Sequence, residues 1–407
     1  MFIYLLISIS FMANAATLKE SYEAARLNME SIKRAEQGVL QREEQKNQAR
    51  AGLLPTVNGF ANYTRIDPPS TLGLSAFTLT KQYNIGVRLT QPLIRGGALG
   101  ALDLAKDNIL LAEFQKDATE LNLYQLVINS YYNLKIAQVD VKNLEKLLSL
   151  SKERVSEIKE RAKIGRSRKG ELVEAEAQLY TAESQYQVGL IQLSQVEENY
   201  EFFTRMKPKT LPELASAPKV EGSLDAYLAK LKSRPDILSA RQQVKAADHQ
   251  VDIAKGSHYP SVDFVGNYYV DRTGVLASSE WDAGVVVSVP FYQGGGVQAA
   301  SRAALAAKRV AELTSHETIR IAEREMRIVY QNYQQILLQL SSLQKALAKS
   351  EEAYKLNKKD YQYGLVTNLD VLQTLNIYIQ TKRSYDNLHA FAHMTYKNLE
   401  SATGALP

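Results

Sequence analysis

The sequence predicts an α+β membrane protein that combines bilayer-crossing strands with very long helices. Three observations predict this fold class. The two halves of the chain repeat the same order of segments, and each half carries two alternating stretches of strand-like length. Each half also contains a helical pattern without proline that far exceeds an ordinary helix, as from Ala98 to Lys163.

The composition excludes several classes of protein. The chain has 407 residues, 45% of them hydrophobic, and a net charge of +5, which gives no indication of a nucleic-acid partner. The absence of cysteine excludes disulfides, thiolate metal sites and cysteine catalysis. Residues 1–15 are apolar and end in Ala-Asn-Ala, which predicts a secretory signal peptide cleaved after Ala15. No basic residue precedes the apolar run, so a terminal strand or helix is the alternative.

Corresponding residues of the two halves define an internal two-fold repeat. Pro55 corresponds to Pro260, and Gly165 corresponds to Gly364. The first repeat is predicted over residues 16–220, with a helix, strands at about 54–66 and 80–92, a long helix at 98–163 and a helix at 171–205. The second is predicted over residues 221–407, with a helix, strands at about 259–271 and 281–291, a long helix at 297–361 and a helix at 370–402.

The four predicted strands alternate between apolar and polar residues, as in Tyr83, Ile85, Val87 and Leu89 against the residues between them. Each strand is about 9 to 11 residues long, which is enough to cross a bilayer when tilted. Aromatic residues lie towards the strand ends, as in the girdles of membrane barrels: Tyr63, Tyr83, Tyr259, Tyr268, Trp281 and Tyr292. A soluble antiparallel sheet with one wet face is the alternative, but strand length, aromatic ends and the export signal favour a barrel.

Four strands cannot form a membrane barrel alone. Backbone groups in lipid need partners, and known barrels have at least eight strands. The chain is therefore predicted to share a barrel with copies of itself, two copies giving eight strands and three giving twelve. The segments Ile66 to Thr80 and Asp271 to Glu280 are expected to be exposed extracellular loops.

Apolar residues in the long helices recur in alternating steps of four and three, as at Leu123, Val127, Ser130 and Leu134. A period of seven residues over this length predicts coiled-coil packing, with an ordinary helical bundle as the alternative. Both long helices end at a glycine turn, Gly165 or Gly364, followed by a returning helix. The segment from Met206 to Ser223 is expected to pack as an irregular belt beside the helices.

A proline and a pair of glycines mark each passage from strand to long helix. Pro92 and Pro290 are expected to end the strand ladder because they lack an N–H. Glycines then permit the sharp turn that redirects the chain. The predicted strand–helix joints are Pro92, Gly96 and Gly97, and Pro290, Gly294 and Gly295.

Together these features resemble the TolC-like outer-membrane efflux protein family, also called outer-membrane factors. The resemblance rests on both P-x-x-x-G-G exits, the segment SRPDI, the turns IGRSRKGELV and YGLVTNLDVL, and the ending NLESATGALP. It implies a homotrimer whose twelve-stranded barrel continues into a helical periplasmic tunnel. It also implies location in the bacterial outer membrane, extending into the periplasm, and docking to a periplasmic adaptor and an inner-membrane transporter of the RND, MFS or ABC type. No catalytic constellation or metal motif emerges from the sequence itself, so no enzymatic activity, cofactor or metal is predicted.

The resemblance also implies a periplasmic gate near the two helix turns. Asp370 matches an acidic gate position, Tyr361 a constricting tyrosine and Glu171 an acidic position of the first turn. Gln373 and Val366 depart from the family pattern, where an acid and an arginine are expected, so an ion-pair lock is doubtful and the entrance is expected to be held differently. The alternative role for Asp370 is a helix N-terminal carboxylate, and the two roles are compatible.

The helix-turn tips are predicted to dock an adaptor. They comprise Gly165, Arg166, Arg168, Lys169, Gly364, Leu365 and Val366. A solvated basic turn is the alternative interpretation. His389 and His393 lie four residues apart but lack the glutamate of a zinc motif, so a metal role is not predicted. The predicted function is a passive exit duct, and the alternatives are a coiled-coil scaffold or an adaptor without a pore.

Overall fold

The computed structural model describes residues 16–65, 81–273 and 277–407. The predicted signal peptide and the predicted loop from Ile66 to Thr80 lie outside these residues, as does part of the second loop. The described chain forms two compact units. The belt unit contains residues 16–33, 117–235 and 320–407, and the sheet unit contains residues 34–65, 81–116, 236–273 and 277–319. Each unit takes parts of both sequence repeats, so a repeat is not a separate domain.

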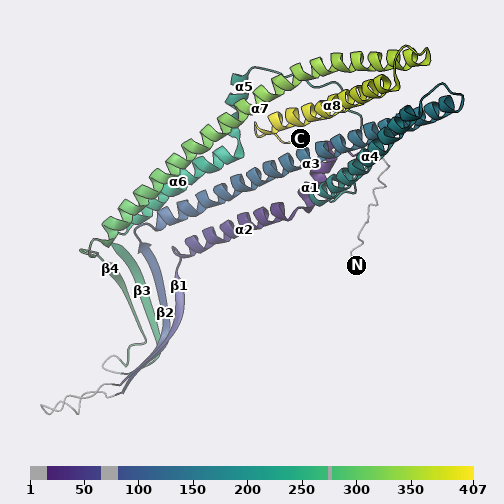
Figure 1. The fold of residues 1–407 in the computed structure, drawn as a ribbon. Coiled ribbons are helices and arrows are strands. Elements are labelled where there is room, and N and C mark those ends of the chain that lie inside the picture. The colour runs from purple at the N-terminus through teal and green to yellow at the C-terminus, as the bar shows by residue number, and fades with distance from the viewer. Residues whose placement is uncertain (1–15, 66–80, 274–276) are drawn as a thin grey trace, which may run out of the picture. The chain divides into compact units, whose positions relative to one another are not determined.

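The two repeats contain the same series of elements (Figure 1). The first comprises α1 (Leu18–Asn28), α2 (Glu30–Ala51), β1 (Thr56–Arg65), β2 (Lys81–Ile94), α3 (Ala98–Lys163) and α4 (Lys169–Thr204). The second comprises α5 (Leu224–Lys230), the 3-10 turn η2 (Leu231–Ser233), α6 (Pro235–Gly256), β3 (Ser261–Arg272), β4 (Trp281–Ser288), α7 (Gly296–Gln362) and α8 (Asn368–Ser401). Helices α3 and α7 contain 66 and 67 residues. In the parts of the chain that the structure describes, no helix combines the length and apolar character that a bilayer crossing requires.

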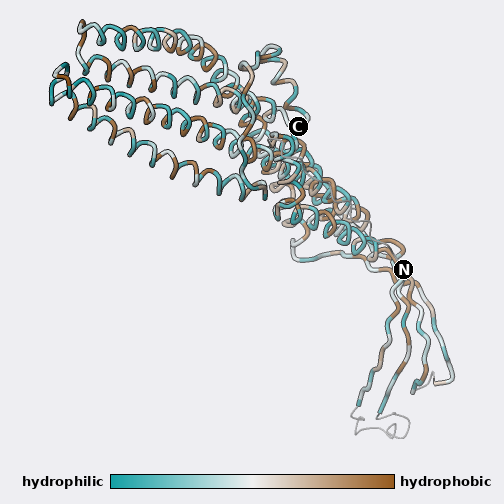
Figure 2. The backbone as a smooth tube through the Cα atoms, turned by 90° about the vertical axis from the view of Figure 1, so that its right-hand side faces the viewer, coloured by the Kyte–Doolittle hydropathy of each residue, from teal (hydrophilic) through white to brown (hydrophobic). Residues whose placement is uncertain are grey.

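The four strands form one antiparallel sheet in the order β1-β2-β3-β4. Val57 pairs with Leu89, Val87 with Tyr268, and Tyr268 with Trp281, so the alternating apolar residues of all four strands share one face. Figure 2 shows the same alternation of hydrophilic and hydrophobic residues along the strands. Most of these apolar side chains are exposed, and Trp281 and Val57 are 69% and 67% exposed. The sheet therefore presents an uncovered apolar face.

The opposite face of the sheet carries a polar network. Asn267 accepts a hydrogen bond from Nε of Arg88 at 2.8 Å and donates one to Asp282 at 2.7 Å. The Tyr269 hydroxyl donates to the same carboxylate at 2.8 Å, and the Arg88 guanidinium lies 5.1 Å from the ring centroid of Phe60. These hydrogen bonds and the cation–π contact link neighbouring strands across all three strand pairs of the sheet. One face of the sheet is thus polar and internally bonded, while the other is apolar.

The prediction that Pro92 ends the strand ladder is wrong. Strand β2 continues to Ile94, with Pro92 opposite Asp263 and an irregularity in the register between Pro92 and Ile94. A bulge leaves a residue without its ladder hydrogen bond, so a residue that lacks an N–H is tolerated there. Pro290 lies beyond the last residue of β4, Ser288.

The glycines of both joints adopt the conformations that only glycine takes easily. Gly97 has φ +80°, Gly294 has φ +62° and Gly295 has φ +79°. A Cβ atom at Gly96 would overlap the carbonyl oxygen of Gly256 at the end of α6. At the first joint, therefore, the chain turns and also packs its backbone directly against the backbone at the end of α6.

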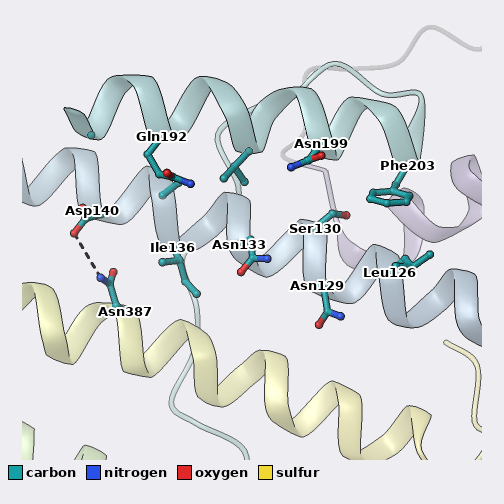
Figure 3. Close-up of a pocket in the computed structure, with 13 residues that line it drawn as sticks. Leu126, Asn129, Ser130, Asn133, Ile136, Asp140, Gln192, Asn199, Phe203 and Asn387 are labelled. Atoms are coloured by element: carbon teal, nitrogen blue, oxygen red, sulfur yellow. Dashed lines mark hydrogen bonds between the residues drawn. The ribbon is translucent and has the colours of Figure 1, made fainter. Parts of the chain in front are cut away.

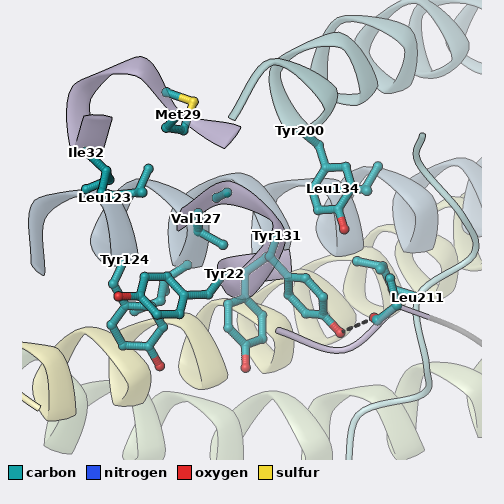
Figure 4. Packing of buried hydrophobic residues seen from close by; sticks show 14 residues of the cluster. Tyr22, Met29, Ile32, Leu123, Tyr124, Val127, Tyr131, Leu134, Tyr200 and Leu211 are labelled. Atoms are coloured by element: carbon teal, nitrogen blue, oxygen red, sulfur yellow. Dashed lines mark hydrogen bonds between the residues drawn. The ribbon is translucent and has the colours of Figure 1, made fainter. Parts of the chain in front are cut away.

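The core of the belt unit is rich in tyrosine. Leu123, Val127 and Leu134, which the heptad pattern placed on one face of the long helix, are all buried. They pack with Tyr22 and Tyr200 from α1 and α4 (Figure 4). The Tyr200 hydroxyl lies 2.7 Å from Oγ of Ser21, so this buried polar atom is satisfied. Burial raises the pKa of Tyr22 to about 12, with a smaller contribution from Glu120.

The segment between α4 and α5 is irregular and is hydrogen-bonded to the long helices, as the sequence predicted. The amide of Gln138 in α3 donates to the Lys209 carbonyl at 2.8 Å and accepts from the Leu211 N–H at 3.0 Å. His393 in α8 lies 2.9 Å from the Ala215 carbonyl oxygen through Nε2. This segment, residues 205–222, is called the belt below.

Candidate functional site

The first helix turn is a glycine-terminated helix end. Gly165 has φ +70°, and the N–H of Arg166 donates to the Arg161 carbonyl at 2.9 Å. This bond closes the end of α3 in the way that a left-handed glycine permits. Arg168 precedes α4, and its N–H donates to the carboxylate of Glu171. Arg166, Arg168 and Lys169 are all exposed at this turn.

The second turn repeats this geometry with apolar residues. Gly364 has φ +76°, and the N–H of Leu365 donates to the Asp360 carbonyl at 3.0 Å. Leu365 is 73% exposed, and Val366 is partly buried. One turn therefore presents three cations and the other an apolar side chain.

Asp370 belongs to a capping box at the start of α8. Its carboxylate accepts hydrogen bonds from the N–H of Thr367 at 2.8 Å and from the Thr367 hydroxyl at 2.6 Å. The Thr367 hydroxyl in turn accepts from the N–H of Asp370 at 3.4 Å. These bonds from the Thr367 side chain and backbone hold the pKa of Asp370 below its usual range. The interpretation of Asp370 as a helix N-terminal carboxylate is confirmed.

Tyr361, the predicted constricting tyrosine, is buried between two arginines of α3. The guanidinium carbons of Arg154 and Arg161 lie 3.9 and 4.8 Å from its ring centroid. Its hydroxyl donates to the carboxylate of Glu171 at 3.4 Å, and its carbonyl accepts from Nη1 of Arg161 at 3.4 Å. Cations over an aromatic face are attracted by the ring quadrupole. Tyr361 thus joins the end of α7 to α3 and α4.

Arg154 extends this cluster to the start of α8. Its side chain is only 5% exposed, and its Nε donates to Oδ1 of Asn368 at 2.9 Å. The Asn368 amide donates to the Glu171 backbone carbonyl at 3.2 Å. Glu157 lies 2.9 Å from Nη1 of Arg154 and 3.6 Å from Nε of Arg161, so one carboxylate forms ion pairs with both arginines. We call Arg154, Glu157, Arg161, Tyr361 and Asn368 the tyrosine clamp.

Of the four predicted gate residues, Tyr361 belongs to the tyrosine clamp, Glu171 contacts it, and Asp370 is bonded instead to Thr367. Tyr361 and Glu171 are brought together, whereas Gln373 is exposed on α8 and does not belong to the cluster. Arg154 and Asn368 were not predicted. A signal for Arg154 exists, because it lies on the same helix stripe as the buried Leu147, Ser151 and Ile158.

A polar groove of about 530 Å³ lies between α3 and α4 in the belt unit. Amide side chains line much of it, including Asn133 and Asn199 (Figure 3). Asp140 accepts two hydrogen bonds from the Arg383 guanidinium, at 2.7 and 2.8 Å, and a longer one from Asn387. The hydrogen bond that Arg383 donates to Asp140 raises the pKa of Arg383. Within the described residues, no group of three or more potential metal-ligating side chains is present.

The fold of this chain is that of solved outer-membrane channels. The structure superimposes on the Campylobacter jejuni CmeC outer membrane channel with a TM-score of 0.83, covering 98% of this chain and 90% of that one at 18% identity. In sequence the chain is 24% identical over 304 residues to the outer membrane efflux protein BepC of Brucella suis, covering 71% of this chain and 64% of BepC. It is 21% identical over 378 residues to the outer membrane protein TolC of Vibrio cholerae, covering 88% of this chain and 84% of TolC.

The family follows from a sequence profile rather than from any single relative. The profile of the outer membrane efflux protein family matches residues 21–198 and again residues 227–405. The chain therefore belongs to the outer membrane efflux protein family, as the sequence predicted, and each repeat matches the family separately. Family membership places it in the bacterial outer membrane, in a family of efflux channels rather than of enzymes.

Proposed function

We propose that three copies of this chain form an exit duct in the outer membrane. A twelve-stranded barrel, four strands from each copy, opens into a helical tunnel that extends into the periplasm. Substrates enter the tunnel from an inner-membrane transporter and leave passively through the barrel. The names of the relatives BepC and TolC, together with the fold shared with CmeC, support this function.

The open sheet is the observation that carries the proposal. It has an uncovered apolar face, while the opposite face bears the Arg88–Asn267–Asp282 network. In lipid, every strand edge must be paired, and only a closed barrel achieves this. An apolar face towards lipid and a polar face towards a lumen is the pattern of membrane barrels. Copies of the chain must therefore complete the barrel, and the resemblance to trimeric channels favours three.

The tyrosine clamp supports a gate at the helix turns. It ties the α7–α8 turn to α3 through Tyr361 and Asn368, so the entrance widens only if these contacts break. Cation–π contacts contribute about 0.5–1 kcal/mol when exposed and about 2 kcal/mol or more when desolvated. Several contacts of this size keep the entrance closed in the resting protein. A partner that docks at the turns can still break them.

The helix-turn tips are suited to docking. The first tip carries the exposed cations Arg166, Arg168 and Lys169, and the second carries the exposed apolar residue Leu365. A periplasmic adaptor with an acidic and apolar helical tip is complementary to this pair of turns. The adaptor in turn connects the duct to an inner-membrane transporter of the RND, MFS or ABC type.

Purification in detergent followed by electron microscopy and planar-bilayer recording tests the proposal. We expect particles with three-fold symmetry and ion conductance in the bilayer. The scaffold and adaptor alternatives predict no conductance. A protein that stays a single chain in buffer without detergent, and does not bind lipid, contradicts the proposed duct.

A further inference from the structure

The polar groove between α3 and α4 has no part in the gate or in the docking tips. Its volume of about 530 Å³ is within the range of sites for small molecules, about 300–1,000 Å³. The residues that line it come from α3, α4 and α8, and all of them belong to the belt unit. The groove is therefore formed within one chain, and the chemistry of its lining determines which molecules fit it.

The groove lies on the side of α3 that faces away from the belt. Lys135 and Gln138 donate hydrogen bonds to carbonyl oxygens of the belt. Asn133 and Asp140, which line the groove, are each two residues away from one of these, and two residues correspond to a rotation of about 200° around a helix. The lumen of a duct has to stay open, whereas the belt covers its side of α3. The groove therefore faces the lumen of the proposed tunnel.

The lining of the groove carries no net charge. Asp140 is the charged residue among the lining side chains, and it accepts two hydrogen bonds from the Arg383 guanidinium, at 2.7 and 2.8 Å. Such a bidentate pair is strong and fixes both side chains. Because each charge is already neutralised by its partner, the groove suits an uncharged molecule.

Amide side chains supply hydrogen-bonding groups along the groove. Within the described residues, the side chains of Asn133, Gln192 and Asn199 form no hydrogen bond, and all three are exposed. Oδ1 of Asn387 is buried and accepts no hydrogen bond from the same part of the chain. Each amide offers two donors and one acceptor oxygen, and a buried acceptor without a donor is unfavourable. A molecule with both N–H and carbonyl groups satisfies this set.

One end of the groove is apolar. The side chains of Leu126 and Phe203 lie together there, and Leu126 is 45% exposed (Figure 3). Asp140 and Asn387 lie at the other end in the same view. At 1.5 Å per residue, the distance along α3 from Leu126 to Asp140 is about 21 Å. The groove is therefore elongated, with an apolar end followed by a row of amides.

We propose that this groove is a luminal binding site for uncharged organic molecules that carry an apolar ring and several amide groups. The ring packs against Leu126 and Phe203, the amides bond to Asn133 and Asn199, and an N–H group donates to Oδ1 of Asn387. The inference rests on the proposed function and deepens it by naming a class of substrate. Weak binding suits a duct, because a bound molecule has to leave as readily as it enters.

Saturation-transfer NMR on the detergent-solubilised protein tests the site, with the capped dipeptide N-acetyl-phenylalanyl-alanine amide as the probe. Asn133→Leu with Asn199→Leu keeps the branched shape of both exposed side chains but removes their amides. We expect this groove variant to bind the probe about ten-fold or more weakly, as for the loss of two hydrogen bonds. Asn332→Leu with Gln339→Leu removes two exposed amides of α7 outside the groove and should leave binding unchanged.

Engineered cysteines test the luminal position, and the natural chain has none to interfere. Asn133→Cys places a thiol in the groove, and Lys142→Cys places one on an exposed position of the belt side. In planar bilayers, we expect a charged methanethiosulfonate reagent to change the single-channel conductance of Asn133→Cys but not that of Lys142→Cys. The capped dipeptide should slow the reaction at Asn133→Cys.

The outcomes separate the groove from the duct. Probe binding that is weakened equally in the groove variant and in the α7 control, or in neither, overturns the binding site and leaves the duct. Unchanged conductance of Asn133→Cys, after mass spectrometry shows that its thiol has reacted, overturns the luminal position. A protein that does not conduct overturns the duct, while the NMR comparison still decides whether the groove binds the probe.

Discussion

At the scale of single residues, Tyr361 is the most informative side chain. Its ring lies between Arg154 and Arg161, its hydroxyl contacts Glu171, and it is 5% exposed. The family pattern suggested a tyrosine paired with an arginine from the second turn, where this chain has Val366. In this chain the arginines that contact the Tyr361 ring come from α3 instead of from the second turn.

Replacing Tyr361 by leucine tests whether this ring keeps the entrance narrow. Tyr361→Leu keeps apolar bulk but removes the aromatic face and the hydroxyl, so both arginines lose a partner. We expect single-channel conductance in planar bilayers to rise about two-fold or more, since contacts worth about 1–2 kcal/mol each are lost.

The matched control is Tyr354→Leu on the same helix. Tyr354 stacks on Tyr378 with ring centroids 5.9 Å apart and is not part of the tyrosine clamp. Equal conductance in Tyr361→Leu and the unaltered protein would remove Tyr361 from the gate.

The sequence singled out Tyr361, Glu171 and Asp370 but not the two arginines that hold the Tyr361 ring. Arg154 is separated from Asn368 by more than half of the chain, and no local pattern connects them. Asp370 was predictable because Thr367 and Asp370 form a capping box within four residues, a purely local signal. Side-chain clusters built from distant helices require the tertiary arrangement that only the structure supplies.

At the scale of elements, the long helices were the most predictable part of the fold. The proline-free heptad pattern predicted residues 98–163, and α3 spans Ala98–Lys163. The failure at Pro92 has a specific cause, because sequence shows where an N–H is missing but not where a bulge makes its loss harmless. Similarly, the heptads predicted which faces are buried but not that the Tyr200 hydroxyl would be satisfied by Ser21 of another helix.

His393 links α8 to the belt and confers a pH dependence on that contact. Burial lowers the pKa of His393, His389 and Lys397 lower it further, and the hydrogen bond to Ala215 acts in the opposite direction. A folded-state pKa below the ordinary value favours the neutral ring. The stability that neutral His393 contributes to the folded protein is therefore complete above its unfolded-state pKa of about 6.5. It is lost as the pH falls through the lower pKa of His393 in the folded state.

We expect the melting temperature of the detergent-solubilised protein to fall as the pH is lowered from 7.5 to 5.5. His393→Gln retains a donor for the Ala215 carbonyl but cannot take up a proton. The fall in melting temperature should therefore be smaller in this variant than in the unaltered protein, by roughly 2 °C or less for a chain of this size. His316→Gln, at an exposed position of α7, is the control. An identical fall in His393→Gln and the unaltered protein would exclude His393 as its source.

At the scale of the whole molecule, the proposed three-fold symmetry repeats each charged side chain three times around one axis. In the proposed trimer, three copies of Asp370 lie near one axis at the periplasmic entrance. Three carboxylates around a pore attract cations and bind divalent ions more strongly than one does. In a single chain, the visible role of Asp370 is only to cap α8 through Thr367.

Asp370→Asn separates these two roles. The asparagine oxygen can still accept the hydrogen bond from the Thr367 N–H, so the cap is retained while the charge is removed. We expect block of the channel by divalent cations to weaken about ten-fold or more, with the melting temperature nearly unchanged. Asp370→Ala, which loses both charge and cap, should weaken the block and lower the melting temperature.

The pH dependence of the block provides an independent check on the same residue. Because the bonds from Thr367 lower the pKa of Asp370, its carboxylate stays ionised where an ordinary aspartate, with a pKa of about 3.9, is becoming neutral. Divalent block of the unaltered channel should therefore persist as pH falls to about 4 and be lost only below that value. Block that remains in Asp370→Asn would assign the cation site to a group other than Asp370.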